Sequence, residues 1–177
     1  MIKLQFPLNI TLHSPRPIFK AYINNVKITC MLDTGADIPV FCKGLDLFKE
    51  YFINTENITP FKKSLLGGFG KDKEDTVLYN IPSVQLADTK ESLIYHNMKI
   101  AVVLKPAIPC DLILSASLFT KMKYTIDCLG NNHYLLIEAN RATYGVGFYN
   151  PKDTIYIFAE DNDKIHLNSR QLGKLSI

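Results

Sequence analysis

A series of strand patterns near the N-terminus is the feature that most constrains the fold. The segments LNITL, PIFKAYI and VKITCML follow one another before Asp33. LNITL alternates apolar and polar residues, which is typical of a strand with one buried face. Asn24 and Asn25 separate the last two segments, and such a pair favours a tight hairpin turn. The pattern predicts a β-meander whose last strand ends at Asp33.

Strand patterns also dominate the rest of the chain, in the segments TVLYNI, SVQLAD, KESLIYH, MKIAVVL, HYLLIEA and TIYIFAE. The clearest helix is predicted over residues 44–52, where Leu45, Phe48 and Phe52 recur at helical spacing. One or two helical turns are predicted over residues 117–122, and NSRQLGKL is a weaker helix pattern near the C-terminus. These elements predict a mostly β fold with one or two short helices, arranged as a closed barrel or as folded-over sheets.

Composition restricts both the number of domains and the kind of partner. The 177 residues, of which 47% are hydrophobic and 21% charged, are typical of one soluble globular domain. The 20 basic residues exceed the 17 acidic ones by three and are scattered, whereas nucleic-acid binders concentrate basic charge on one face. No stretch is apolar over the length of a membrane span. We therefore expect neither nucleic acid nor a membrane as a partner.

The cysteines and histidines show no metal-binding spacing. Cys30, Cys42, Cys110 and Cys128 are widely separated, without a CxxC pair or an adjacent His cluster. We expect no metal and no other cofactor, and we interpret the four cysteines as buried thiols. The N-terminal segment reaches a proline too early for the apolar core of a signal peptide. A reducing, cytoplasmic location is therefore expected.

The segment CMLDTGADIP places an ionisable group at the end of an apolar strand. Burying a carboxylate is unfavourable unless it is paired, hydrogen-bonded or protonated. Thr34 can fix the local backbone through its hydroxyl, and Gly35 allows a sharp turn and the close approach of another group. Asp33 is therefore either the acid of a plain turn or a carboxylate held at a shared centre. The triplet alone does not decide between these interpretations.

Three segments in a fixed order carry a family resemblance. CMLDTGAD, then GGFG at residues 67–70, then CDLILSASLF at residues 110–119 together resemble the retropepsin-like aspartic proteases, of the bacterial or cellular type rather than the compact viral type. In that family these segments hold the catalytic aspartate, a flap over the substrate, and an apolar brace beneath the catalytic loop. The resemblance implies the retropepsin-like closed β-barrel over residues 1–140, with residues 141–177 as an extension packed on that domain or on a dimer interface.

The resemblance assigns a role to each residue of the first segment. Asp33 matches the catalytic aspartate, and Thr34 matches the residue whose hydroxyl links two active-site loops across a dimer. Gly35 and Ala36 match backbone that holds the substrate, with Gly35 also part of the active-site loop. Asp37 matches an acid that lines the substrate groove.

The other two segments supply the remaining expected substrate contacts. The resemblance implies a flap tip formed by Gly67, Gly68, Phe69 and Gly70, and an apolar brace formed by Leu112, Ile113 and Leu114, of which Ile113 or Leu114 would wall a substrate pocket. A mobile surface turn without a ligand is the alternative for GGFG. Ser115 stands where the family usually has Gly, and Ala116 stands where viral members have an Arg that pairs with the groove acid. Ser115 in place of Gly is the feature that favours a catalytically weak or inactive peptide-binding dimer as the alternative function.

A single Asp-Thr-Gly in the chain implies that two chains form one active site. Aspartic protease chemistry uses two carboxylates roughly 3 Å apart that share one proton, and the sequence holds only one such triplet. The expected function is therefore a homodimeric aspartic endopeptidase that uses Asp33 from each chain and a water nucleophile on a protein or peptide substrate. The alternatives are a catalytically weak or inactive retropepsin-like dimer that binds peptides, and an unrelated β-barrel binding protein.

Overall fold

The computed structural model describes residues 1–11, 14–52, 60–66, 74–105, 108–129, 132–145, 158–160 and 164–166. The predicted meander is confirmed, with β1 at Ile2–Thr11, β2 at Ser14–Ile23 and β3 at Val26–Asp33. The turn between β2 and β3 places Asn24 at φ 48° and Asn25 at φ 68°. Asparagine tolerates this left-handed backbone better than most residues, which explains the hairpin at this point.

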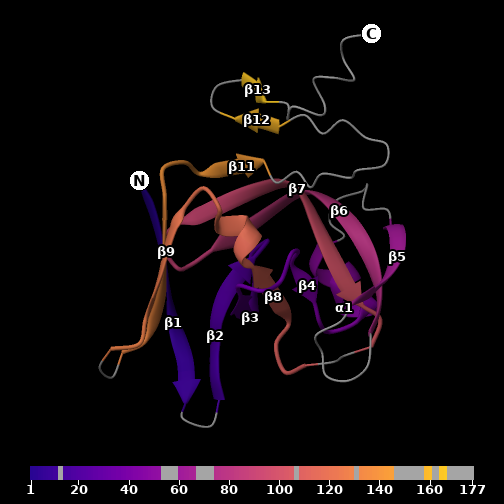
Figure 1. Cartoon of the computed structure of the whole chain (residues 1–177), viewed down its shortest axis with the longest axis horizontal. Coiled ribbons are helices and arrows are strands. Elements are labelled where there is room, and N and C mark those ends of the chain that lie inside the picture. Colours follow the sequence, from indigo (N-terminus) through magenta and orange to yellow (C-terminus); the bar gives the residue numbers. More distant parts are fainter. Residues whose placement is uncertain are drawn as a thin grey trace.

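The remaining elements alternate long and short strands with little helix (Figure 1). In chain order they are β4 (Val40–Phe41), α1 (Leu45–Phe52), β5 (Pro60–Leu66), β6 (Glu74–Ala87), β7 (Ser92–Val103), β8 (Leu112–Ser115), the 3₁₀ turn η1 (Ala116–Phe119), β9 (Lys123–Asp127), β10 (Tyr134–Ala139), β11 (Thr143–Gly145), β12 (Phe158–Glu160) and β13 (Lys164–His166). The predicted mostly β class with one or two short helical segments is confirmed.

Strand pairing closes the central sheet into a ring. The strand order is β5-β6-β7-β4-β8-β3-β2-β1-β10-β9, and an additional pairing of β6 with β2 joins the two sides. β11 extends β7 in parallel, whereas β12 and β13 form a separate two-stranded sheet. Within this ring, the parallel pairing of β3 with β8 brings segments far apart in sequence side by side.

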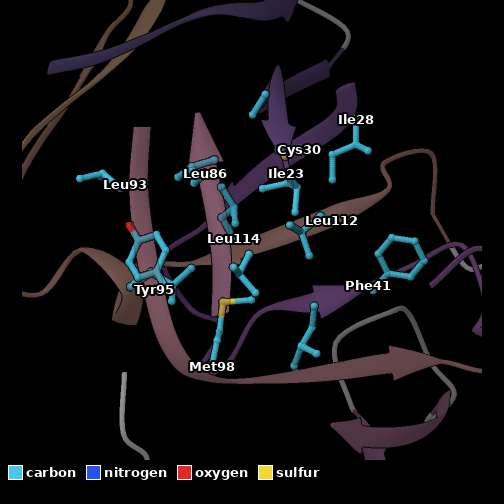
Figure 2. Close-up of a cluster of buried hydrophobic side chains, with 14 of the residues drawn as sticks. Ile23, Ile28, Cys30, Phe41, Leu86, Leu93, Tyr95, Met98, Leu112 and Leu114 are labelled. Carbon is cyan, nitrogen blue, oxygen red and sulfur yellow. The ribbon is translucent and has the colours of Figure 1, made fainter. Parts of the chain in front are cut away.

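The main hydrophobic core includes buried side chains from β3, β8 and α1. Figure 2 shows Cys30 of β3 close to Leu112 and Leu114 of β8, within one cluster of buried side chains. Phe48 and Phe52 of α1 stack on each other at 4.9 Å between ring centroids, and Phe41 lies 5.6 Å from Phe48. The residues whose helical spacing predicted α1 therefore form the face that packs against the core.

Several local predictions differ from the structure. The four segments predicted between residues 74 and 104 form only two long strands, because β6 and β7 pair on both sides of Asn97, whose positive φ of 55° is accommodated within β7. The predicted turns at residues 117–122 form η1, which ends at Phe119. Cys128 is exposed, since it follows the edge strand β9, whereas the other three cysteines are buried as expected. The helix pattern NSRQLGKL lies outside the described residues.

Candidate active site

Asp33 ends a strand whose inward side chains are buried. Ile28, Cys30 and Leu32 point into the core, and the half-buried Asp33 comes directly after them. The Gly35 N–H donates to the Asp33 Oδ1 at 2.9 Å. This bond fixes the carboxylate over its own loop while leaving its second oxygen open to other groups.

The loop after Asp33 faces away from the core. Thr34, Gly35 and Asp37 are exposed, and Ala36 is half-buried. The Ala36 N–H lies 3.4 Å from the Asp33 carbonyl oxygen, which closes the turn. A Cβ added to Gly35 would lie 3.4 Å from the Asp33 Oδ1, so a side chain there would stand beside the carboxylate. The loop therefore presents Asp33 at a surface open to a substrate or a second chain.

Ser115 supports this loop from β8. The parallel register places Ser115 opposite Asp33, and its side chain is fully buried. The Ser115 hydroxyl donates to the Ala36 carbonyl oxygen. The Ser117 N–H donates to the Ser115 Oγ at 3.1 Å, and the two hydroxyl oxygens lie 2.7 Å apart. Serine at this position therefore connects the brace to the Asp-Thr-Gly-Ala loop by a buried hydrogen bond.

The two predicted pocket residues pack on different sides of β8. Leu114 belongs to the main core, whereas Ile113 belongs to a second buried cluster with Val40. Ala36 and Ile38, both partly buried, pack against this second cluster. Ile113 is thus the nearer of the two to the exposed loop, and both side chains are buried in the single chain.

Two residues that sequence reasoning missed also hold the site. Ser117 supports Ser115 as described above. The Asp111 carboxylate accepts a hydrogen bond from the Thr29 N–H at 2.7 Å, and the Asp111 N–H donates to the Thr29 carbonyl oxygen at 2.8 Å. The Asp111 carbonyl oxygen accepts from the Cys42 N–H at 2.8 Å. Asp111 thereby joins β3 to the segments preceding β8 and following β4, and the only sequence signal was an acid before an apolar run.

The flap residues Gly67, Gly68, Phe69 and Gly70 lie outside the described residues. The strands on either side of them are described: β5 pairs antiparallel with β6, and Leu66 lies opposite Glu74. The resemblance left Asp37 without the arginine that pairs with the groove acid in viral members of the resembled family. No basic side chain in the described part of the chain forms an ion pair with Asp37.

Two of the three buried thiols, Cys30 and Cys42, are held protonated rather than poised as nucleophiles. A hydrogen bond with the Cys110 thiol, together with burial, raises the pKa of Cys42. Burial raises the pKa of Cys30 well above its ordinary value. Within the described ranges, no group of three His, Cys, Asp or Glu side chains could hold a metal ion, and no helix is both long and apolar enough to cross a membrane.

Comparison with known proteins identifies structural relatives but no sequence family. No protein-family model matches the chain, and no curated protein matches it in sequence. The chain is similar in structure to a retropepsin-like aspartic protease from Rickettsia conorii, with 20% identity and a TM-score of 0.47 over 77% of this chain and 91% of that one. It is also similar to the EIAV protease complexed with the inhibitor HBY-793, with 19% identity and a TM-score of 0.39 over 63% of this chain and 91% of that one.

Proposed function

We propose that this protein is an aspartic endopeptidase whose active site forms between two copies of the chain. The observation that carries the proposal is the placement of Asp33. The carboxylate stands at the end of a buried strand, on an exposed Asp-Thr-Gly-Ala loop that Ser115 holds from below. A plain turn would not require a fully buried serine hydroxyl to fix the carbonyl of its fourth residue, which favours a loop built for precise placement.

The chemistry follows from two such carboxylates meeting across a twofold axis. Like charges roughly 3 Å apart cannot both ionise, so one Asp33 holds a proton while the other is charged. The charged carboxylate accepts a proton from a water molecule as that water attacks the peptide carbonyl carbon, and the protonated carboxyl donates a hydrogen bond to the carbonyl oxygen. The Gly35 N–H bond orients each carboxylate for these roles. The substrate would lie extended across the two loops.

The proposed activity has a direct assay. The purified protein should digest an unfolded protein at mildly acidic pH, where one carboxyl of the pair is protonated, and a statine-type transition-state analogue should block the digestion. Peptide binding without cleavage would instead support the inactive dimer. Absence of both binding and cleavage would leave only the unrelated barrel.

We further propose that β9 forms the contact between the two copies. β9 is the last strand of the sheet path, so its edge away from β10 has no strand partner in the described part of the chain. Tyr124 and Ile126 on β9 are 36% and 39% exposed. An unpaired edge with apolar side chains is suited to strand addition. Pairing of two β9 strands about a twofold axis would continue the β1-β10-β9 sheet into the second copy.

Changing Ile126 to Lys should weaken this contact. Two lysines brought together across a twofold axis repel each other, so the dimer dissociation constant should rise by at least about tenfold, as measured by sedimentation velocity over a range of concentrations. Cleavage per chain should fall in parallel at low protein concentration. Leu104→Lys is the matched control, because Leu104 is 41% exposed but lies outside β9. An unchanged dimer in Ile126→Lys would exclude β9 as the interface.

A further inference from the structure

A groove opens where β1 and β2 separate. The two strands pair only near the turn that joins them, at Leu8 with Phe19, Asn9 with Ile18 and Thr11 with Ser14. The first half of β1 instead pairs with β10, while β2 continues along β3 and meets β6. Figure 1 shows the two strands separating toward the N-terminus. The resulting cavity of about 880 Å³, here called the strand-fork groove, lies between β1, β2, β3 and the turn that links β6 to β7.

The acids of the groove are already engaged with the backbone. The Asp88 carboxylate accepts hydrogen bonds from the N–H groups of Gln5 at 2.9 Å, Lys90 at 2.7 Å and Glu91 at 2.8 Å. Burial acts to raise the pKa of Asp88, but these donors outweigh it and hold the pKa below its ordinary value. The Glu91 carboxylate accepts from the Lys3 N–H. Both acids therefore fasten the β6–β7 turn to β1.

The lysines of the groove outnumber these acids. Lys3, Lys20, Lys27 and Lys90 line it, against Asp88 and Glu91. The Lys3 ammonium is paired with a glutamate of β10 at 3.4 Å. Lys20 and Lys27 are exposed on the neighbouring strands β2 and β3, and no carboxylate in the described part of the chain forms an ion pair with either. This side of the groove therefore carries positive charge that no carboxylate among the described residues offsets by an ion pair.

The lining between the charged groups is mostly apolar or aromatic, with Gln5, Asn9, Thr29 and Thr89 as its uncharged polar members. It includes Pro7, Ile18, Phe19, Tyr22 and Leu136, and the Lys27 ammonium lies 5.9 Å from the centre of the Tyr22 ring. An extended peptide alternates its side chains between two directions. Such a peptide can place apolar side chains against the lining while its acidic side chains reach the lysines. The phosphates of a nucleic acid could also pair with the lysines. A nucleic acid has no apolar side chains that alternate with its charges, so it would match the apolar part of the lining less well than such a peptide.

We propose that the strand-fork groove binds an extended peptide segment of a partner protein in which acidic and apolar side chains alternate. The site is separate from the proposed active site, because it adjoins Thr29 while Asp33 lies about 13 Å further along β3. One wall of the groove, the β6–β7 turn, bonds to the edge of β1 opposite to β10, and no described residue of β9 lines the groove, so a dimer formed through β9 would leave it open. Peptide binding here requires neither Asp33 nor proteolysis.

The test uses the full chain carrying Asp33→Asn, so that bound peptide is not cut. The probe is a fluorescein-labelled peptide of about ten residues with alternating Glu and Leu. Its binding is measured by fluorescence anisotropy. We expect saturable binding that weakens by about tenfold in Lys20→Glu/Lys27→Glu. The matched control Lys49→Glu/Lys105→Glu changes the net charge equally at exposed lysines outside the groove, and it should bind within about twofold of the parent protein.

Several outcomes would overturn the proposal. The first is the absence of saturable binding of the probe. The second is an equal loss of affinity for the probe in the groove variant and in the control variant. The third is a peptide with Lys in place of Glu that binds as tightly as the probe. Displacement of the probe by a single-stranded oligonucleotide at equal charge would reveal an unselective polyanion surface and would also overturn it. Amide chemical shifts in the protein without lysine substitutions provide an independent check, since addition of peptide should shift Tyr22 and Thr29 more than residues of α1.

Discussion

Replacement of Asp33 by Asn is expected to reduce peptide cleavage by about 10⁴-fold or more while the protein remains folded and dimeric. In a homodimer the substitution removes both carboxylates at once, so neither a proton acceptor for the attacking water nor a shared acidic proton remains. The amide has nearly the same shape and can still accept the Gly35 N–H bond through its oxygen. Cleavage is measured as kcat/KM on an unfolded protein or peptide, and folding by circular dichroism.

Asp37→Asn is the matched control for this substitution. It makes the same chemical change four residues further along the exposed loop. If Asp37 only lines the substrate groove, kcat/KM of its amide variant should fall by less than about tenfold, mainly through a higher KM. Cleavage that persists in purified Asp33→Asn would remove Asp33 from the chemistry and would overturn the proposed function. Equal losses in both variants would mean that the loop, rather than one carboxylate, had been disturbed.

Ser115→Ala is expected to lower both stability and activity. The substitution leaves the Ala36 carbonyl oxygen without its buried donor and the Ser117 N–H without its acceptor. An unsatisfied buried polar group costs about 1–3 kcal/mol, so the free energy of unfolding in urea should fall by about that amount. The loop that carries Asp33 should also be held less firmly, and kcat should fall by about tenfold.

Ser117→Ala separates support of the loop from general packing. It removes a neighbouring hydroxyl but leaves the Ser115 bond to Ala36 in place, so its losses in kcat and stability should be clearly smaller. Ser115→Gly restores the residue that is usual in the resembled family, and it should behave like Ser115→Ala because it also lacks the hydroxyl. Normal kcat in Ser115→Ala would show that the hydrogen bond does not position the catalytic loop.

Local signals allowed the sequence to predict the strands around the site. The alternation in β1, the Asn24-Asn25 turn and the helical spacing of Phe48 and Phe52 each depend on residues close in the chain. Each was confirmed because hydrophobic periodicity and turn preference act over a few residues. The strand end at Asp33 was predicted on the same basis.

Long-range pairing could not be predicted in the same way. Ser115 and Ala36 are 79 residues apart, and their contact depends on the parallel register of β3 and β8. A shift of one residue in that register would move Ser115 away from the loop. From the sequence, Ser115 was only a departure from the Gly that is usual in the resembled family, whereas the structure shows that its hydroxyl bonds to the loop. The separation of β1 from β2 is likewise a long-range feature, because the β6–β7 turn, through Asp88 and Glu91, bonds to the edge of β1 that β2 leaves.

The stoichiometry of a transition-state analogue provides the most direct test of a shared active site. Calorimetric titration of the dimer with a statine-type inhibitor should give one inhibitor per two chains, because a single pair of Asp33 carboxylates would form one site. The same titration of Asp33→Asn should show binding weakened by about a hundredfold or more, since the analogue's hydroxyl would lose its charged and protonated partners. One inhibitor per chain, or equal binding to Asp33→Asn, would contradict an active site formed by two copies of Asp33.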